Sequence, residues 1–293
     1  MQKITFTNAK GQSLEISNKN PFVLTEITGL GELGADLQRQ TSLFQDGSTF
    51  IDAFLEERGI SIGFVIKGMN QDEIQKKRLE ISSILNPKLG EGTLIYENSN
   101  GVKVIQAISE HIPTFPNGSN NKGATFQRVI LDFICPNPYF RNIVDEKTEI
   151  AFWEPQFEFP LEITGEGIEM GIRSPSLIVN VLNDGHVDTG MIIKFRALGT
   201  VVNPSLVNVN TGESFKINRT LTAGEIITVN TNSGKKRIES TLNGVTTNIF
   251  NNIVFGSTFL QLEIGDNLFR YDADQYLEAL EVDIYHSPQF VGV

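Results

Sequence analysis

The sequence predicts a two-domain protein whose first half is α+β, with antiparallel strands and one helix, and whose second half is all-β. Its length of 293 residues suits about two domains of ordinary size. Only one segment, residues 70–87, has a clear helical pattern. In the second half, short apolar runs and turns alternate about every dozen residues, which is typical of an antiparallel sandwich or jelly roll.

The N-terminal segment predicts a hairpin that turns at Lys10-Gly11, because apolar and polar residues alternate on both sides of that turn. The alternating apolar residues are Ile4, Phe6, Leu14 and Ile16. A third strand is expected over PFVLTEI, residues 21–27.

The next segment, GLGELGADLQRQ (residues 29–40), places Leu30, Leu33 and Leu37 among glycines and polar residues. The pattern is too broken to predict a helix or a strand. Leucines in such a loop either close the domain's own core or await a partner surface, and both interpretations stay open. Gln45-Asp46-Gly47-Ser48 follows as a turn, since Asp-Gly suits a positive φ, and Phe50 begins the next apolar run.

The predicted helix begins at Asn70, whose side chain suits an N-cap, with Glu73 at the capping-box position. Asn86-Pro87 should end it. Its expected apolar stripe consists of Ile74, Ile81, Ile84 and Leu85.

Two further features complete the first half. A second hairpin is expected around Asn98–Gly101, and the last strand leads into FICPNPYFRN, residues 133–142. Cys135, the only cysteine, has no basic or histidine neighbour that would stabilise a thiolate, which favours a buried structural role. The buried positions expected in this strand are Phe126, Val129 or Ile130, Leu131, Phe133 and Cys135.

Composition changes after the two prolines of that segment. Residues 145–169 hold eight acidic side chains and one lysine. We therefore expect a first domain over 1–143, an acidic linker over 144–160 and a β-sandwich over 161–293. Glu154 and Glu158 could suggest a glycosidase pair, but acidic residues in a proline-containing linker are the simpler interpretation.

In the second domain, strands are expected wherever an apolar run lies between turns. These runs are SLIVNVLN (176–183), MIIKFRALG (191–199), SLVNVN (205–210), ESFKIN (213–218), EIITVNT (225–231), RIESTL (237–242), TFLQLEIG (258–265) and ALEVDIYH (279–286). One of the expected turns is Gly265-Asp266-Asn267.

Several function classes are disfavoured. The net charge of −11 argues against nucleic-acid binding, which needs clustered cations. No apolar run is long enough to predict membrane insertion, and the N-terminus lacks the pattern of an export signal. The three histidines match no metal spacing, although Asp184, His186 and Asp188 would share one side of an extended segment. No catalytic centre, metal or cofactor is predicted.

Several patterns occur in the order found in siphophage distal tail proteins. In the first half, QDGSTFID (45–52), the capped helix ending in Asn-Pro and the strand ending in CPNPYF resemble that family. In the second half, residues 183–213 and LQLEIGDNLFRYDA (260–273) resemble its β-sandwich arm. The resemblance covers essentially the whole chain.

The resemblance implies a structural protein of a phage or prophage tail tip, assembled in the bacterial host cytoplasm. Such proteins form a ring, usually hexameric, whose faces meet the major tail tube protein and the tail-associated hub protein. Their galectin-like second domain in some phages holds receptor-binding or baseplate proteins. A carbohydrate-binding module that aids adsorption to the host is the alternative. The residues expected at the subunit interface are Leu30, Leu33, Leu37, Gln45, Asp46 and Phe50.

Overall fold

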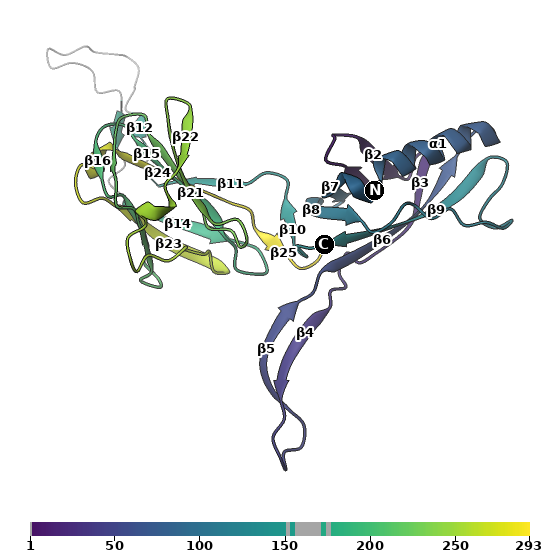
Figure 1. Ribbon diagram of the computed structural model, residues 1–293, viewed down its shortest axis with the longest axis horizontal. Helices are drawn as coiled ribbons and strands as arrows, with labels where there is room; N and C mark the ends of the chain where they lie inside the picture. Colours follow the sequence, from purple (N-terminus) through teal and green to yellow (C-terminus); the bar gives the residue numbers. More distant parts are fainter. Residues whose placement is uncertain (1, 151–152, 156–170, 174–176) are drawn as a thin grey trace. The chain divides into compact units, whose positions relative to one another are not determined.

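The computed structural model describes residues 2–150, 153–155, 171–173 and 177–293. The chain divides into two compact units (Figure 1). Unit 1 comprises Met1–Ile143 together with Phe290–Val293, and unit 2 comprises Val144–Gln289. The last four residues were expected in the second domain. They belong to unit 1 because it binds their backbone: Leu30 O accepts from Val293 N at 3.3 Å, and Arg58 donates to Val291 O.

Unit 1 is built on a nine-stranded sheet with the order β25-β10-β8-β7-β1-β2-β3-β6-β9. A further pairing of β8 with β9, Ile108 opposite Ile134, closes seven of these strands into a barrel. The strands are β1 (Lys3–Thr7), β2 (Ser13–Ser17), β3 (Phe22–Thr28), β6 (Arg58–Lys67), β7 (Gly92–Asn98), β8 (Gly101–Ser109), β9 (Phe126–Cys135), β10 (Phe140–Asn142) and β25 (Gln289–Phe290).

Alternation along these strands builds the core of unit 1, since every second side chain faces inward. Both predicted hairpins are confirmed: β1 pairs with β2 and β7 with β8, antiparallel. In β9, two of the residues considered for the core face outward: Ile130 is exposed and Phe126 is only half-buried. They are separated from the inward residues because side chains alternate along the strand. The inward apolar residues of β9 are Val129, Leu131, Phe133 and Cys135, and Gln127 is buried on the same side.

The predicted helix is α1 (Gln71–Ile84), capped by Asn70, whose Oδ1 accepts from Glu73 N at 2.9 Å. The capping box is altered, because the Glu73 carboxylate accepts from Met69 N, one residue before the cap, at 2.7 Å. A short 3-10 turn, η1 (Pro87–Leu89), follows the helix. The expected apolar stripe is buried: Ile74, Ile81, Ile84 and Leu85. Within the described residues, no helix is long and apolar enough to cross a membrane.

The segment that looked too broken for regular structure forms a hairpin. Strands β4 (Ala35–Gln40) and β5 (Thr49–Leu55) pair with each other and with no other described strand. All of their residues are exposed, so no core contact produced the periodicity that would have marked them. Figure 1 shows the hairpin extending beyond the sheet of unit 1.

Unit 2 is built on two sheets that enclose one core. The first sheet, in spatial order, is β11 (Glu146–Glu149), β24 (Leu280–His286), β15 (Met191–Ala197), β20 (Ile226–Asn230), β21 (Arg237–Leu242) and β22 (Val245–Asn248). The second is β14 (Ile178–Asn183), β23 (Gly265–Asp272), β17 (Ser205–Asn208) and β18 (Ser214–Lys216). Inward residues of both sheets, such as Phe195 and Phe269, share the core.

Shorter elements accompany these sheets. They are the pairs β12 (Trp153–Pro155) with β13 (Gly171–Arg173) and β16 (Val201–Val202) with β19 (Thr220–Leu221), and the 3-10 turns η2 (Phe250–Asn252) and η3 (Leu277–Ala279).

Two expectations for the second half differ from the structure. Within the acidic segment expected as a linker, residues 144–160, Glu146–Glu149 form β11 because their backbone pairs with β24; Glu158 lies outside the described residues. The strand expected over 258–265 is also misplaced. The Asn267 side chain bonds Glu263 N and O at 3.0 and 2.8 Å, which fixes the turn before Gly265 and lets β23 begin where the turn was expected.

Candidate assembly surface

The β4–β5 hairpin has one apolar and one polar face. Leu37 lies opposite Ala53, and Arg39 lies opposite Phe50, because the strand register shifts between Gln38 and Arg39 and leaves Ile51 as the extra residue. Side chains two apart share a face. One face therefore holds Ala35, Leu37, Arg39, Phe50, Ala53 and Leu55. The other holds Asp36, Gln38, Gln40, Thr49, Asp52 and Phe54.

The apolar face is open to solvent in the isolated chain. Leu37 is 47% exposed and Phe50 63% exposed, and the bulge residue Ile51 is 60% exposed. A two-stranded hairpin on its own is at best marginally stable in water. Contiguous exposed apolar residues are typical of surfaces that bind a partner, which makes this face a candidate binding surface.

The tip of the hairpin presents a second apolar feature. Leu43 and Phe44 are 90% and 106% exposed, and Phe44 has a φ of 67°, a conformation that side-chain-bearing residues rarely adopt. The turn is held by Gln45 N, which donates to Ser42 O at 3.2 Å. Gly47, with a φ of 79°, supplies the left-handed position predicted for Asp-Gly.

Arg58 fixes the base of the hairpin. Its side chain is 1% exposed, and it donates to Gly29 O at 2.7 Å, to Pro138 O at 2.8 Å and to Val291 O. The guanidinium also lies 4.9 Å from the ring centre of Phe140. Burial lowers the pKa of Arg58. A buried cation held mainly by backbone carbonyls ties three distant segments together.

At the base of the hairpin, the backbone at Gly29 lies close to the backbone at Gly59. Gly29 has a φ of +86°, and a Cβ there would lie 2.0 Å from the carbonyl oxygen of Gly59. Only glycine fits this crossing. The hairpin therefore leaves the barrel at a fixed point.

The predicted interface residues separate into two groups. Leu30 packs against the core of unit 1, which is the first of its two open interpretations, and Leu33 is half-buried. The others lie on the hairpin and are exposed: Leu37, Gln45, Asp46 and Phe50. Whether they contact another subunit remains a prediction.

Sequence reasoning missed two features of the hairpin, the buried residue at its base and the exposed apolar residues near its tip. Arg58 was not singled out, because nothing local distinguishes a buried arginine from an exposed one. Leu43, Phe44 and Ile51 were passed over, although an apolar pair directly before a turn was a usable signal.

Cys135 is buried, as predicted for a structural cysteine. Burial raises the pKa of its thiol to about 12, and the nearby Arg58 only partly opposes that effect. The thiol is therefore protonated at neutral pH, which disfavours a role as a nucleophile.

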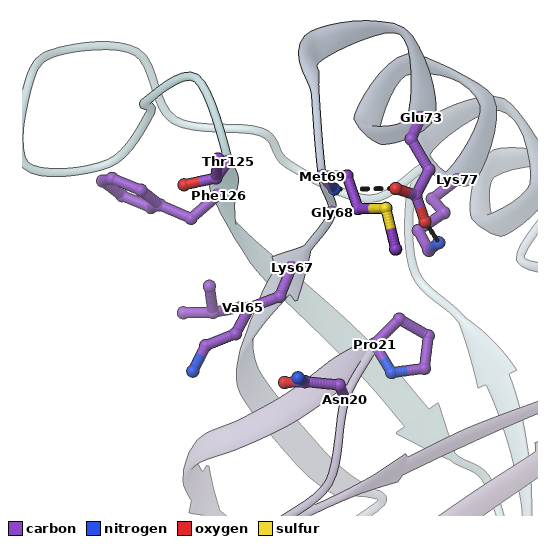
Figure 2. A pocket seen from close by; sticks show the side chains of 10 residues that line it. All are labelled: Asn20, Pro21, Val65, Lys67, Gly68, Met69, Glu73, Lys77, Thr125 and Phe126. Atoms are coloured by element: carbon purple, nitrogen blue, oxygen red, sulfur yellow. Dashed lines mark hydrogen bonds and ion pairs between the residues drawn. The ribbon is translucent and has the colours of Figure 1, made fainter.

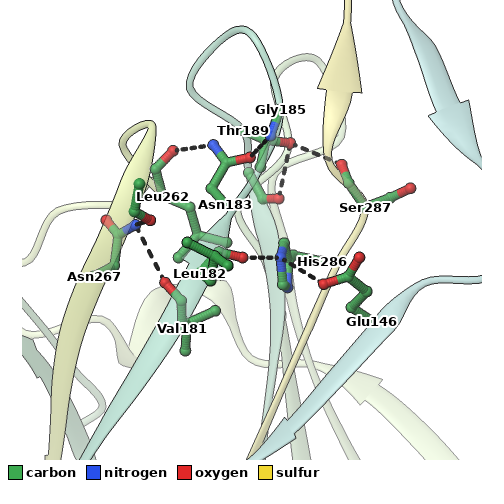
Figure 3. Close-up of polar contacts among 12 residues, drawn as sticks. Glu146, Val181, Leu182, Asn183, Gly185, Thr189, Leu262, Asn267, His286 and Ser287 are labelled. Atoms are coloured by element: carbon green, nitrogen blue, oxygen red, sulfur yellow. Dashed lines mark hydrogen bonds and ion pairs between the residues drawn. The ribbon is translucent and has the colours of Figure 1, made fainter.

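The histidine segment of unit 2 is a folded turn. The Asn183 side chain donates to Val187 O at 3.0 Å and to Leu262 O at 3.2 Å, and accepts from Gly185 N at 3.1 Å (Figure 3). Asp188 accepts from Ile264 N at 3.2 Å. Among the described residues, no group of three or more His, Cys, Asp or Glu side chains could hold a metal ion.

His286 lies at the end of β24 beside this turn. Its Nε2 donates to Leu182 O at 3.0 Å and lies 3.6 Å from a Glu146 carboxylate oxygen (Figure 3). Its Nδ1 is buried and has no hydrogen-bond partner among the residues that the structure describes. The arrangement pins β14 and β11 to β24, which is a structural role.

Sugar sites usually contain an exposed aromatic platform, and the described tyrosines of unit 2 differ in their surroundings. Tyr271 is buried in the core of unit 2. The Tyr285 ring lies beneath the Lys194 ammonium, 4.6 Å from its centre. Tyr276 is exposed, as is Phe255 on a turn of unit 2.

Two family models match the sequence, one in each half. Residues 9–135 match a phage tail protein RIFT-related domain. Residues 184–290 match the C-terminal domain of the siphovirus-type tail component. No curated protein matches the chain significantly.

Solved structures share the fold over nearly the full length. The crystal structure of the Dit (gp 19.1) protein of SPP1, described as a paradigm of the hub adsorption apparatus in phages infecting Gram-positive hosts, superposes with a TM-score of 0.67 at 15% identity. It covers 98% of this chain and 99% of its own. A chain of the phage P2 baseplate, activated with Ca, matches with a TM-score of 0.56 at 9% identity, covering 100% of both chains. A chain of the same baseplate activated with Sr matches with a TM-score of 0.51 at 10% identity, covering 98% of both chains.

Proposed function

The chain belongs to the siphophage distal tail protein family, and on that premise we propose that it closes a hexameric ring at the tip of a non-contractile tail. The ring would join the major tail tube protein to the tail-associated hub and baseplate proteins in the virion, after assembly in the host cytoplasm. Its task is assembly rather than catalysis.

The β4–β5 hairpin is the observation that carries this proposal. Its apolar face, centred on Leu37 and Phe50, has no partner among the described residues of its own chain. A ring needs heterologous contacts, in which two different patches meet repeatedly around the circle. A projecting ribbon with an apolar face suits one of those patches.

The proposal is tested by measuring mass in solution across a range of concentrations, using size-exclusion chromatography with light scattering, followed by negative-stain images. Rings of six subunits are expected. A monomer at every concentration, with no rings in the images, would count against the proposal.

A pair of matched variants separates the two faces of the hairpin. Leu37→Asp places a charge on the apolar face, whereas Gln38→Asp places the same side chain one residue away on the polar face. Only Leu37→Asp should prevent ring formation, with unit 2 still folded by circular dichroism. Equal behaviour of the two variants would show that the apolar face is not the contact.

For unit 2 we propose a galectin-like sandwich that holds a receptor-binding or baseplate protein. The support is its two-sheet architecture around one core and its match to the tail component's C-terminal domain. The alternative, carbohydrate binding, has weaker support, because Tyr271 is buried and Tyr285 is covered by Lys194. A glycan array with unit 2 variant Tyr276→Ala as control would decide between them: saturable binding lost in the variant favours the carbohydrate alternative.

A further inference from the structure

The structure points to the site that receives the hairpin tip, and this inference rests on the proposed ring. We propose that Leu43 and Phe44 of one copy insert into a hollow at the opposite end of the β3–β6 strand pair in the next copy. The occupant is thus a second copy of this chain, bound head to tail.

The hollow lies where β6 ends and α1 begins. It has a volume of about 790 Å³, within the range of pockets that hold small ligands. Its apolar walls come from Pro21, Val65, Met69 and Phe126. Figure 2 shows Val65 and Lys67 pointing the same way from β6, with Phe126 above them and the Met69 side chain reaching toward Pro21.

The Met69 side chain adds to the case for a partner at this site. It is 90% exposed at the rim of the hollow. Methionine is flexible and polarizable, contacts aromatic rings favourably and is common at binding surfaces. An inserted phenylalanine ring would cover it.

The positions of tip and hollow exclude a contact within one chain. The hairpin leaves β3 after Thr28 and returns at Arg58, while the hollow surrounds Pro21 and Lys67 at the other end of the same antiparallel pair. Ten residues of β6 separate the two ends, about 30 Å of extended strand. A projection at one end and a recess at the other generate head-to-tail association.

Charge at the two sites is complementary. Asp46 lies two residues after Phe44 on the exposed tip. At the hollow, Glu73 pairs with Lys77, so that cation and carboxylate largely neutralise each other. Lys67 is exposed and forms no ion pair with the described residues. It remains available to the incoming Asp46.

Cysteine cross-linking tests the pairing directly. The variant Phe44→Cys with Met69→Cys, treated with a short bismaleimide, should give a ladder of linked copies beyond the dimer. The control is Phe44→Cys with Ser99→Cys, which places the second thiol on another exposed turn of unit 1. The native Cys135 is buried and should not react.

The outcomes distinguish this pairing from the ring itself. A ladder for the 44–69 pair and none for the 44–99 pair supports the inference. Rings seen by mass without a 44–69 ladder, or equal ladders in both variants, overturn the pairing and leave the ring proposal standing. Neither rings nor ladder overturns both.

Two substitution tests add independent measures. Phe44→Asp should weaken self-association about thirtyfold per contact, the loss expected from one buried aromatic side chain. Asp46→Lys and Lys67→Asp should each weaken association severalfold, and the double variant should recover it. No recovery would contradict the ion pair across the contact.

Discussion

The replacement Arg58→Met should destabilise unit 1 selectively. Methionine fills a similar length but removes the three donors to Gly29 O, Pro138 O and Val291 O. These carbonyls lie at the hairpin base, at the exit of β9 and in the C-terminal segment. The substitution therefore loosens three segments at once.

The magnitude follows from these contacts. Hydrogen bonds to a charged group contribute about 1.5–3 kcal/mol each, so three bonds give a gross loss of roughly 5–9 kcal/mol. Releasing the guanidinium from its buried site recovers several kcal/mol of desolvation cost. The net loss in free energy of unfolding should be about 3–4 kcal/mol. For a domain of about 150 residues this corresponds to a Tm decrease of roughly 6–16 °C.

Differential scanning calorimetry of the full chain measures this effect, provided that the transitions of the two units are assigned. The same substitution at Arg128, an exposed residue of β9, is the matched control and should change Tm by less than about 2 °C. The Tm decrease of Arg58→Lys should lie between those of Arg58→Met and the control, since lysine keeps the charge but lacks the planar guanidinium. Removal of residues 290–293 combined with Arg58→Met should lower the Tm by less than the sum of the two separate decreases, because the two changes remove a shared contact. A Tm for Arg58→Met equal to that of the control would refute the reasoning.

Three further predictions concern other sites. Leu37→Asp should weaken self-association and raise its dissociation constant Kd at least tenfold relative to Gln38→Asp, measured by analytical ultracentrifugation. Equal Kd values for the two variants would contradict this prediction. The thiol of Cys135 should not react with an aromatic disulfide at pH 8 until denaturant is added, and rapid reaction of the folded protein would show that burial does not protect it. Burial of Glu225 would raise its pKa, but hydrogen bonds from Ser240, Arg219 and Thr222 N outweigh it and lower the pKa below 4.5. The stability contributed by the Glu225 carboxylate is therefore present above pH 4.5 and is lost as the pH falls through the lowered pKa. Glu225→Gln should then flatten the decline in the Tm of unit 2 at acid pH. An unchanged dependence of Tm on pH would contradict this prediction.

Local physics determined much of unit 1 from the sequence. The helix at Gln71–Ile84 was predictable because an N-cap, a 3.6-residue apolar period and a proline after its end all agree. The hairpins of β1–β2 and β7–β8 were predictable because alternation and turn residues coincide.

The candidate interface residues were predictable only in part. Leu37 and Phe50 were identified as candidate contact residues, and the structure places both on one hairpin face. Their shared face depends on the register shift at Gln38/Arg39, which no local pattern reveals. The hairpin itself was missed because all residues of its strands are exposed and no core contact marks them in the sequence.

The sequence by itself determined the class of the protein, the order of its two units and most strands that face a core, because these depend on residues near one another in the chain. The tertiary structure decided what joins distant segments. Arg58 is an ordinary arginine in the sequence, yet folding brings Gly29, Pro138 and Val291 around it. Leu30 and Leu37 look alike in sequence, and only the folded chain packs Leu30, partly buried, against the core and leaves Leu37 on an exposed hairpin. The reason is that burial and pairing are set by contacts of high sequence separation, which a linear pattern does not encode.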